Sequence, residues 1–203
     1  MIKMSQTILR KIVLLQIVID SMTNKKHLDI LKKLKNKKVG IFCDSANLYH
    51  AYQKYGWRVD IKKFKKFINQ YCNLEFLNYY LVIPAKNDAS YRGTQAFIKK
   101  IKPSVIIKSK ELKYTPIGGR IMKKGNMDVE ITLDVVRMID NLDTVILISG
   151  DSDFLELKNY IIKEKKKSII FMGYEENMAW ELRQCWHVYL NRIKEEVVFL
   201  EQK

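Results

Sequence analysis

The chain of 203 residues has few of the residues that interrupt or crosslink a fold. Three prolines and eight glycines argue against long linkers between separate domains. The three cysteines, Cys43, Cys72 and Cys185, are scattered and form no Cys-x-x-Cys pair. This spacing argues against a zinc ribbon or a disulfide framework and is typical of a reduced protein. We therefore predict a cytoplasmic location.

Long apolar runs are also missing. No run in the sequence approaches the ~20 residues that a membrane helix needs, so no membrane partner is expected. Residues 12–19 (IVLLQIVI) superficially resemble the core of a signal peptide, but the run is short and no small-residue cleavage site follows it. We interpret this segment as an amphipathic helix or as translated upstream sequence, since Met4 and Met22 could each be the start.

Acidic residues are few relative to basic ones. The chain has 37 Lys and Arg against 22 Asp and Glu, a formal net charge of +15. Such an excess favours a polyanionic partner such as RNA, although a lysine-rich composition alone leaves the choice open. Residues 1–38 hold ten Lys and Arg against two acidic residues, and this basic extension could contact phosphate or mediate self-association as a homo-oligomer.

Short apolar runs alternate with helical stretches along the rest of the chain. The pattern predicts strands at 39–43, 76–83, 105–108, 144–149 and 168–172, with an edge strand at 187–190. It predicts helices at 27–38, 60–72, 89–101, 127–139, 154–163 and 176–185, and an irregular hairpin at 111–124. This alternation indicates an α/β fold with a parallel sheet covered by helices on both faces. The predicted organisation is a helical N-terminal extension at 1–38, a domain at 39–190 and a C-terminal helix at 191–203.

Aspartates follow two of the predicted strands where each strand ends. Asp44 follows the first strand, and Asp151 and Asp153 follow the fourth. Asp128 stands at the start of the predicted helix at 127–139. In parallel sheets, ligands bind outside the carboxyl ends of the strands. Three or more carboxylates gathered there would repel one another unless a cation lay between them, and carboxylate oxygens suit Mg²⁺ or Mn²⁺.

Each of these residues also has a purely structural interpretation. Asp44 and Asp153 could cap helices, and Asp128 could be a favourable acid in a first helical turn. Asn47 could be an ordinary turn residue. Their joint occurrence favours a functional site.

Three segments resemble the signature blocks of a known family. They are CDSAN at 43–47, KKGNMDVEITLD at 123–134 and SGDSDFLEL at 149–157. In this order they resemble NYN domains, which are PIN-like nuclease domains, and the likeness is to the LabA-like branch. The resemblance covers roughly residues 38–173 and implies a Rossmann-like (PIN-like) sheet with metal-dependent ribonuclease chemistry.

The resemblance also implies roles for single residues. The metal-site carboxylates would be Asp44, Asp128, Asp151 and Asp153, and Asn47 would orient a carboxylate, a water or a phosphate. A second tier of supporting residues comprises Asp134, Ser149 and Ser152, with Asp134 about 120° around the helix from Asp128. Candidate contacts to RNA phosphate are Lys123, Lys124 and Arg120, although a solvated charged surface explains this run equally well.

Alternative functions can be compared with these motifs. A haloacid-dehalogenase-type phosphatase needs Asp-x-Asp-x-Thr after the first strand, where this chain has Asp44-Ser-Ala-Asn47. Walker and Gly-x-Gly-x-x-Gly loops are absent, which argues against NTP hydrolysis and dinucleotide binding. A non-catalytic RNA-binding or regulatory module with the same fold stays open as the alternative to a nuclease.

Overall fold

A parallel sheet of six strands forms the centre of the molecule. The computed structural model describes residues 24–118 and 120–200. The sheet has the order β3-β2-β1-β6-β7-β8, and every neighbouring pair of strands is parallel. Its strands are β1 (Lys38–Asp44), β2 (Asn73–Ile83), β3 (Ile106–Glu111), β6 (Thr144–Ile148), β7 (Ser168–Gly173) and β8 (His187–Tyr189). The predicted α/β fold is confirmed.

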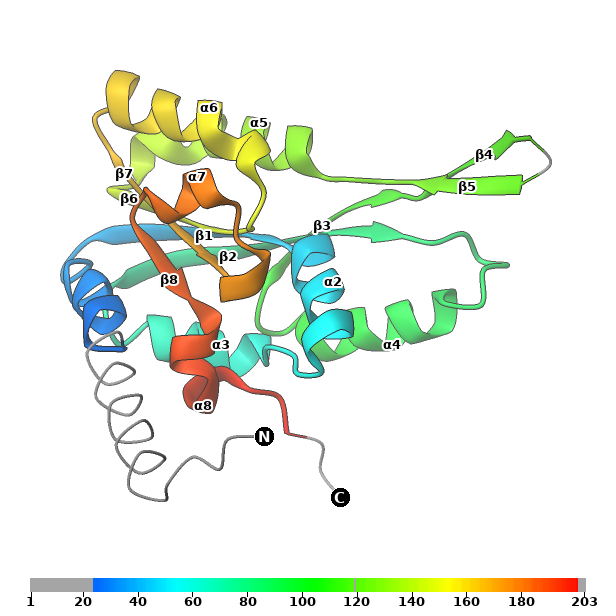
Figure 1. Ribbon diagram of the computed structural model, residues 1–203, viewed down its shortest axis with the longest axis horizontal. Helices are drawn as coiled ribbons and strands as arrows, with labels where there is room; N and C mark the ends of the chain where they lie inside the picture. The colour runs from blue at the N-terminus through cyan, green and yellow to red at the C-terminus, as the bar shows by residue number, and fades with distance from the viewer. Residues whose placement is uncertain (1–23, 119, 201–203) are drawn as a thin grey trace, which may run out of the picture.

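Helices cover both faces of this sheet (Figure 1). The α-helices are α2 (Ser45–Tyr55), α3 (Ile61–Ile68), α4 (Tyr91–Ile101), α5 (Asp128–Met138), α6 (Leu155–Asn159), α7 (Trp180–Arg183) and α8 (Lys194–Val197). The 3-10 helical turns are η1 (Ile139–Asn141), η2 (Ser152–Phe154), η4 (Glu175–Asn177) and η5 (Leu190–Ile193), and η3 (Tyr160–Glu164) is a π-helical turn. No helix in these two described ranges is both long and apolar enough to cross a membrane.

Side chains that alternate along the central strands build two separate cores. In β1, Ile41 and Cys43 belong to the cluster beneath α2, α3 and α8, whereas Phe42 belongs to the cluster beneath α5, α6 and α7. In β6, Ile146 and Leu147 divide between the two clusters in the same way. Because successive side chains of a strand point to opposite faces, a continuously apolar strand has to be buried on both.

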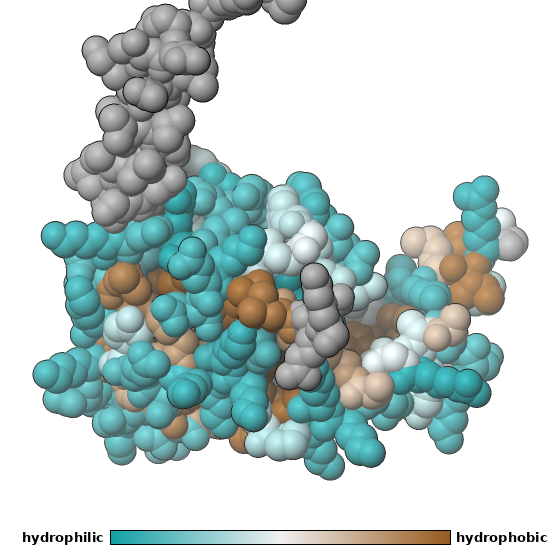
Figure 2. Space-filling view, turned by 90° about the horizontal axis from the view of Figure 1, so that it is seen from below, coloured by the Kyte–Doolittle hydropathy of each residue, from teal (hydrophilic) through white to brown (hydrophobic). Residues whose placement is uncertain are grey.

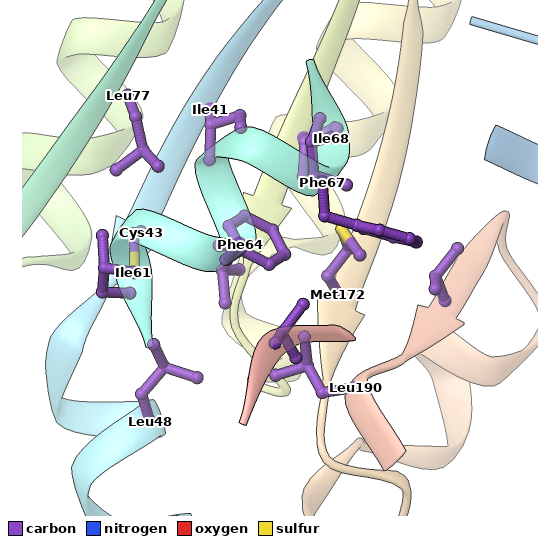
Figure 3. Packing of buried hydrophobic residues seen from close by; sticks show 14 of the residues in the cluster. Ile41, Cys43, Leu48, Ile61, Phe64, Phe67, Ile68, Leu77, Met172 and Leu190 are labelled. Carbon is purple, nitrogen blue, oxygen red and sulfur yellow. The ribbon is translucent and has the colours of Figure 1, made fainter. Parts of the chain in front are cut away.

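Helix α3 shows how sequence spacing produces this packing (Figure 3). Asp60 caps the helix by accepting hydrogen bonds from the backbone N–H groups of Lys62 and Lys63. Phe64 and Ile68, one helical turn apart, are fully buried against the sheet, whereas Lys62, Lys63 and Lys66 are exposed. The helix ends at Ile68, earlier than the predicted boundary.

The hairpin predicted at 111–124 is confirmed. It consists of β4 (Lys113–Ile117) and β5 (Arg120–Lys124), which are antiparallel and separate from the main sheet. Gly118 adopts the left-handed conformation in its turn. The hairpin projects from the body beyond the end of β3 (Figure 1).

The predicted C-terminal helix at 191–203 is wrong in extent. Only η5 and α8 are helical, and the chain is extended from Val198. Val198 forms an antiparallel bridge with Val59, and the Phe199 N–H donates to the Arg58 carbonyl at 2.9 Å. Pairing with this neighbouring loop uses backbone groups that a continuing helix would need. Residues 201–203 lie outside the described part.

The N-terminal extension predicted at 1–38 is partly a component of the core. Residues 24–32 are helical, and Leu31 and Leu34 are almost completely buried in the cluster that contains α3. His27 lies against the rings of His187 and Tyr189 at the far edge of the sheet. Residues 1–23, including the apolar run at 12–19, lie outside the described part.

Candidate acidic site at the carboxyl edge of the sheet

The sheet topology brings the aspartates of the separate motifs to one edge. Asp44 is the last residue of β1, and Asp151 follows the end of β6. These two strands are parallel neighbours, with Cys43 opposite Ile148. Their carboxyl ends therefore lie side by side, as predicted from the sequence.

Asp44 is the most enclosed carboxylate of this edge, with 7% of its surface exposed. It caps α2 by accepting hydrogen bonds from the N–H groups of Ala46 at 3.0 Å and Asn47 at 3.4 Å. Its other oxygen accepts a hydrogen bond from Ser149 Oγ at 3.2 Å. Burial raises the pKa of Asp44 above its ordinary value, these hydrogen bonds oppose the rise, and the charge of Asp151 adds to it. The capping interpretation is thus correct, and it does not exclude a functional role.

Asp128 starts α5 and receives a hydrogen bond from Asn126 Nδ2 at 2.6 Å. Its pKa is raised to about 6, first by partial burial and then by the negative charges of Asp44, Asp151 and Asp153. The charges of the other three predicted aspartates therefore all act on Asp128.

Ser149 and Gly150 explain why the loop after β6 has its shape. Ser149 is fully buried, and its hydroxyl joins Asp44 to the backbone N–H of Asp151, at 3.3 Å from the latter. A side chain on Gly150 would meet the carbonyl oxygen of Asn177 at 2.3 Å, so only glycine fits there. Asp151 then caps η2 by accepting from the N–H of Asp153 at 3.0 Å.

The remaining predicted residues of the site are Ser152 and Asp153 in this loop and Asn47 in the first turn of α2. Asp153 is exposed and Ser152 is half-buried. Asn47 differs, because its Oδ1 atom is buried and has no hydrogen-bond partner among the described residues. An unpaired buried acceptor is costly, so this oxygen is available for a ligand of the site.

Asp134 lies apart from the acidic cluster. It accepts a hydrogen bond from the Tyr80 hydroxyl at 2.9 Å and forms an ion pair with Lys108 at 3.3 Å. These contacts join α5 to β2 and β3. The separation predicted from helical geometry agrees with this placement, and the contacts favour a structural role.

The predicted cationic residues lie on the hairpin. Lys123 pairs with Asp88 at 2.7 Å, and Asp88 also accepts a hydrogen bond from the Tyr114 hydroxyl. These contacts, Lys123 first, hold the pKa of the Asp88 carboxyl well below its usual range. Lys124 and Arg120 are exposed on β5. Lys123 thus anchors the hairpin to the loop after β2.

Lys110 is a cation near the site that the sequence interpretation missed. It stands near the end of β3 and lowers the pKa of Asp128, against the effect of the aspartates. Glu130 holds its ammonium group with contacts of 2.7 and 2.9 Å. Its position two residues after the strand predicted at 105–108 was the available signal, because the carboxyl edge of the sheet also holds the aspartates.

The cluster is a site of strong negative charge. Within residues 24–118 and 120–200, no group of three or more His, Cys, Asp or Glu side chains is positioned to hold a metal ion. The four carboxylates converge without forming a ready-made coordination shell. Chemically, such a cluster can attract a hydrated cation or accept protons.

Comparisons with known proteins agree with this geometry. The NYN domain model matches residues 38–191. The chain is 27% identical over 155 residues to the low amplitude and bright protein LabA of Synechococcus elongatus, which covers 76% of this chain and 83% of LabA. A crystal structure of a protein of unknown function from Vibrio parahaemolyticus has the same fold, with a TM-score of 0.64 and 24% identity over 81% of this chain and 97% of that one. Since the family model spans most of the chain and its motifs meet at one edge of the sheet, the chain belongs to the NYN domain family.

Proposed function

We propose that the protein is a metal-dependent ribonuclease that hydrolyses RNA phosphodiester bonds at the acidic edge. The observation that carries this proposal is the placement of Asp44, Asp128, Asp151 and Asp153 at one edge of the sheet, where partial burial first, and then the charges of the other three aspartates, raise the pKa of Asp128 to about 6. A protein that needed these residues only as helix caps would have no reason to place them where they repel. NYN domains are generally nucleases, which supports the same function.

The donor chemistry of the site suits Mg²⁺ or Mn²⁺. Its acceptors are carboxylate oxygens and the buried, unpaired Oδ1 of Asn47, which are hard ligands. Mg²⁺ keeps several of its waters in protein sites, so direct coordination by three carboxylates is not required. A cation held there would supply a nucleophile from water at neutral pH and neutralise charge on the phosphate.

The chain's own residues have distinct tasks in this proposal. Asp44, fixed by Ser149 and by the first turn of α2, provides the rigid carboxylate of the site. Asp151 and Asp128 approach it from the loop after β6 and from the start of α5. Lys110, held by Glu130, lies where it can attract a phosphate towards these acids.

The hairpin offers a basic surface for the RNA backbone. Residues 113–124 carry four Lys and Arg and no acidic residue, and Lys124 stands only four residues before Asp128. Figure 2 shows apolar side chains gathered on the same projecting hairpin, where Ile117, Ile121 and Met122 are exposed. A basic and apolar arm of this kind suits contact with phosphates and unpaired bases.

A non-catalytic RNA-binding or regulatory module is the second candidate. It is favoured by one observation: the described acidic side chains are not positioned as ready metal ligands. The two functions differ in one respect, because the module binds RNA without any metal-dependent cleavage.

The test is cleavage of labelled single-stranded RNA by purified protein in Mg²⁺, in Mn²⁺ and in EDTA. Asp151→Asn removes one charge of the cluster, and Asp140→Asn removes an exposed carboxylate paired with Lys165 elsewhere on the surface. We expect metal-dependent cleavage by the wild type and by Asp140→Asn, and none by Asp151→Asn. Full activity of Asp151→Asn would refute the site, and RNA binding without cleavage by any of the proteins would favour the non-catalytic module.

A further inference from the structure

Trp180 is the most exposed of the large apolar residues described, with 70% of its surface accessible. It is the first residue of α7, the short helix that packs against η2 in the loop carrying Asp151 and Asp153. Single exposed apolar side chains are ordinary on protein surfaces, so exposure alone does not imply a ligand for this indole. Its position next to the acidic loop indicates which ligand that could be.

Backbone contacts place Trp180 close to the acidic cluster. The N–H of Ala179 donates to the carbonyl of Gly150 at 2.9 Å. Trp180 follows Ala179 and Asp151 follows Gly150, so standard backbone dimensions keep the Cα atoms of Trp180 and Asp151 within about 11 Å of each other. The backbone of Trp180 therefore lies within reach of the loop that carries Asp151.

The segment that carries Trp180 is held rigidly. Arg183 donates from Nε to the carbonyl of Met178 and from Nη2 to the carbonyl of Glu175, both at 3.0 Å. The N–H of Glu175 donates to Asn191 Oδ1 at 2.9 Å. A fixed backbone reduces the entropy that a binding surface loses when its ligand arrives, so Trp180 is prepared for stacking.

The charges around Trp180 decide the kind of contact. Glu176 and Glu181 are exposed on the same segment, and the aspartate cluster lies next to it. Arg183, the one cation of residues 174–183, already donates to backbone carbonyls, so without a metal ion this segment does not attract phosphate, and binding energy has to come from an uncharged group. The flat faces of nucleic-acid bases provide that energy through stacking on tryptophan, in single strands whose bases are free.

We propose that Trp180 stacks on an unpaired RNA base beside the cleavage site and so selects single-stranded RNA. This proposal rests on the ribonuclease proposed above. It assigns recognition to two parts of the surface, with the basic hairpin contacting the backbone and Trp180 contacting a base. A paired base in a duplex is already stacked and cannot reach the indole.

The test measures RNA affinity in EDTA, so that it does not depend on cleavage. Fluorescein-labelled single-stranded RNA, and the same strand annealed to its complement, are titrated with full-length wild type, Trp180→Ala, Trp180→Phe and Trp186→Ala at one salt concentration. Trp186 is a matched control because it is also an exposed tryptophan. It lies under the Lys33 ammonium group and stands at the amino end of β8, whereas the aspartates lie at the carboxyl ends of the strands.

We expect Trp180→Ala to weaken binding of the single strand by about 5- to 150-fold, the range for loss of one stacked base. Trp180→Phe should retain most of the affinity, and Trp186→Ala should bind like the wild type. Quenching of intrinsic tryptophan fluorescence by the single strand should disappear in Trp180→Phe. The melting temperature of each variant shows whether it has kept its fold.

Several outcomes would overturn the proposal. One is a Trp180→Ala variant that binds the single strand as tightly as the wild type, and another is an equal loss on single strand and duplex. A wild-type dimer that Trp180→Ala converts to a monomer would show that a second copy of the chain covers the indole. Absence of RNA binding by every protein in EDTA, together with absence of cleavage by the wild type in Mg²⁺ and Mn²⁺, would instead refute the ribonuclease proposal itself.

Discussion

Asp128→Asn should stabilise the metal-free protein while abolishing the proposed ribonuclease activity. At neutral pH the wild type has to keep the Asp128 carboxylate charged although burial and three neighbouring aspartates favour its neutral form. Asparagine removes the charge and retains an oxygen that can accept the hydrogen bond from Asn126 Nδ2. The variant therefore loses a repulsion and keeps the local contact.

The size of the effect follows from the pKa. A rise from 3.8 to about 6 corresponds to about 3 kcal/mol, since each pKa unit equals about 1.4 kcal/mol. The Asp128 side chain is partly exposed, so solvent screening reduces the expected gain in the free energy of unfolding to about 1.5 kcal/mol. For a chain of this size that gain raises the melting temperature by about 3–6 °C.

The pH dependence has a defined sign. The folded-state pKa is raised, so the folded protein binds a proton before the unfolded chain as the pH falls from about 6 towards 3.8. Above this window, the cost of keeping Asp128 charged lowers the free energy of unfolding of the wild type, and protonation of Asp128 within the window removes that cost. The advantage of Asp128→Asn should therefore be largest near pH 7.5 and should shrink towards pH 4.

The assay is thermal and chemical unfolding in EDTA at pH 7.5 and at pH 4.5, followed by the same measurement with Mg²⁺ or Mn²⁺. The metal should raise the melting temperature of the wild type more than that of Asp128→Asn, because the variant has lost a carboxylate. Asp134→Asn is the matched control on the same helix, and it should be destabilised because it loses the ion pair with Lys108. An Asp128→Asn variant no more stable than the wild type at pH 7.5 would refute the reasoning.

Three further changes test other parts of the fold. Burial lowers the pKa of His27 to about 4. The free energy of unfolding of the wild type should therefore fall by up to about 3 kcal/mol as the pH drops from 6.5 to 4. Chemical denaturation of His27→Gln should show a free energy of unfolding that depends less on pH. Gly150→Ala forces a methyl group against the carbonyl of Asn177. It should lower the free energy of unfolding by about 1–3 kcal/mol or more and reduce the proposed RNA cleavage. Wild-type values in both assays would contradict the close approach of these two backbone segments. Leu31→Ala should cost about 2–5 kcal/mol in urea unfolding because Leu31 is fully buried, and a neutral effect would place the helix at residues 24–32 outside the cooperative core.

Local sequence patterns are sufficient to predict most elements of this fold. Continuously apolar strands such as β6 can exist only where helices cover both faces, and the apolar spacing of α3 specifies one buried face. The ends of elements depend on contacts that no local pattern contains. The chain leaves the helical conformation at Val198 because Val59, far away in sequence, pairs with it.

The sequence by itself determined which residue types the acidic site would have and which edge of the sheet would hold them. Aspartates after two apolar strands and at a helix start must gather wherever parallel strands end together. Only the tertiary structure decided how the members differ, because burial and mutual charge raise the pKa of Asp128 while Asp134, on the same helix, is held by Tyr80 and Lys108. The tertiary structure also decided the neighbours of the site, because Lys110 and Trp180 belong to distant segments of the chain. The position of Lys110 depends on the strand order, and that of Trp180 depends on one backbone hydrogen bond to Gly150.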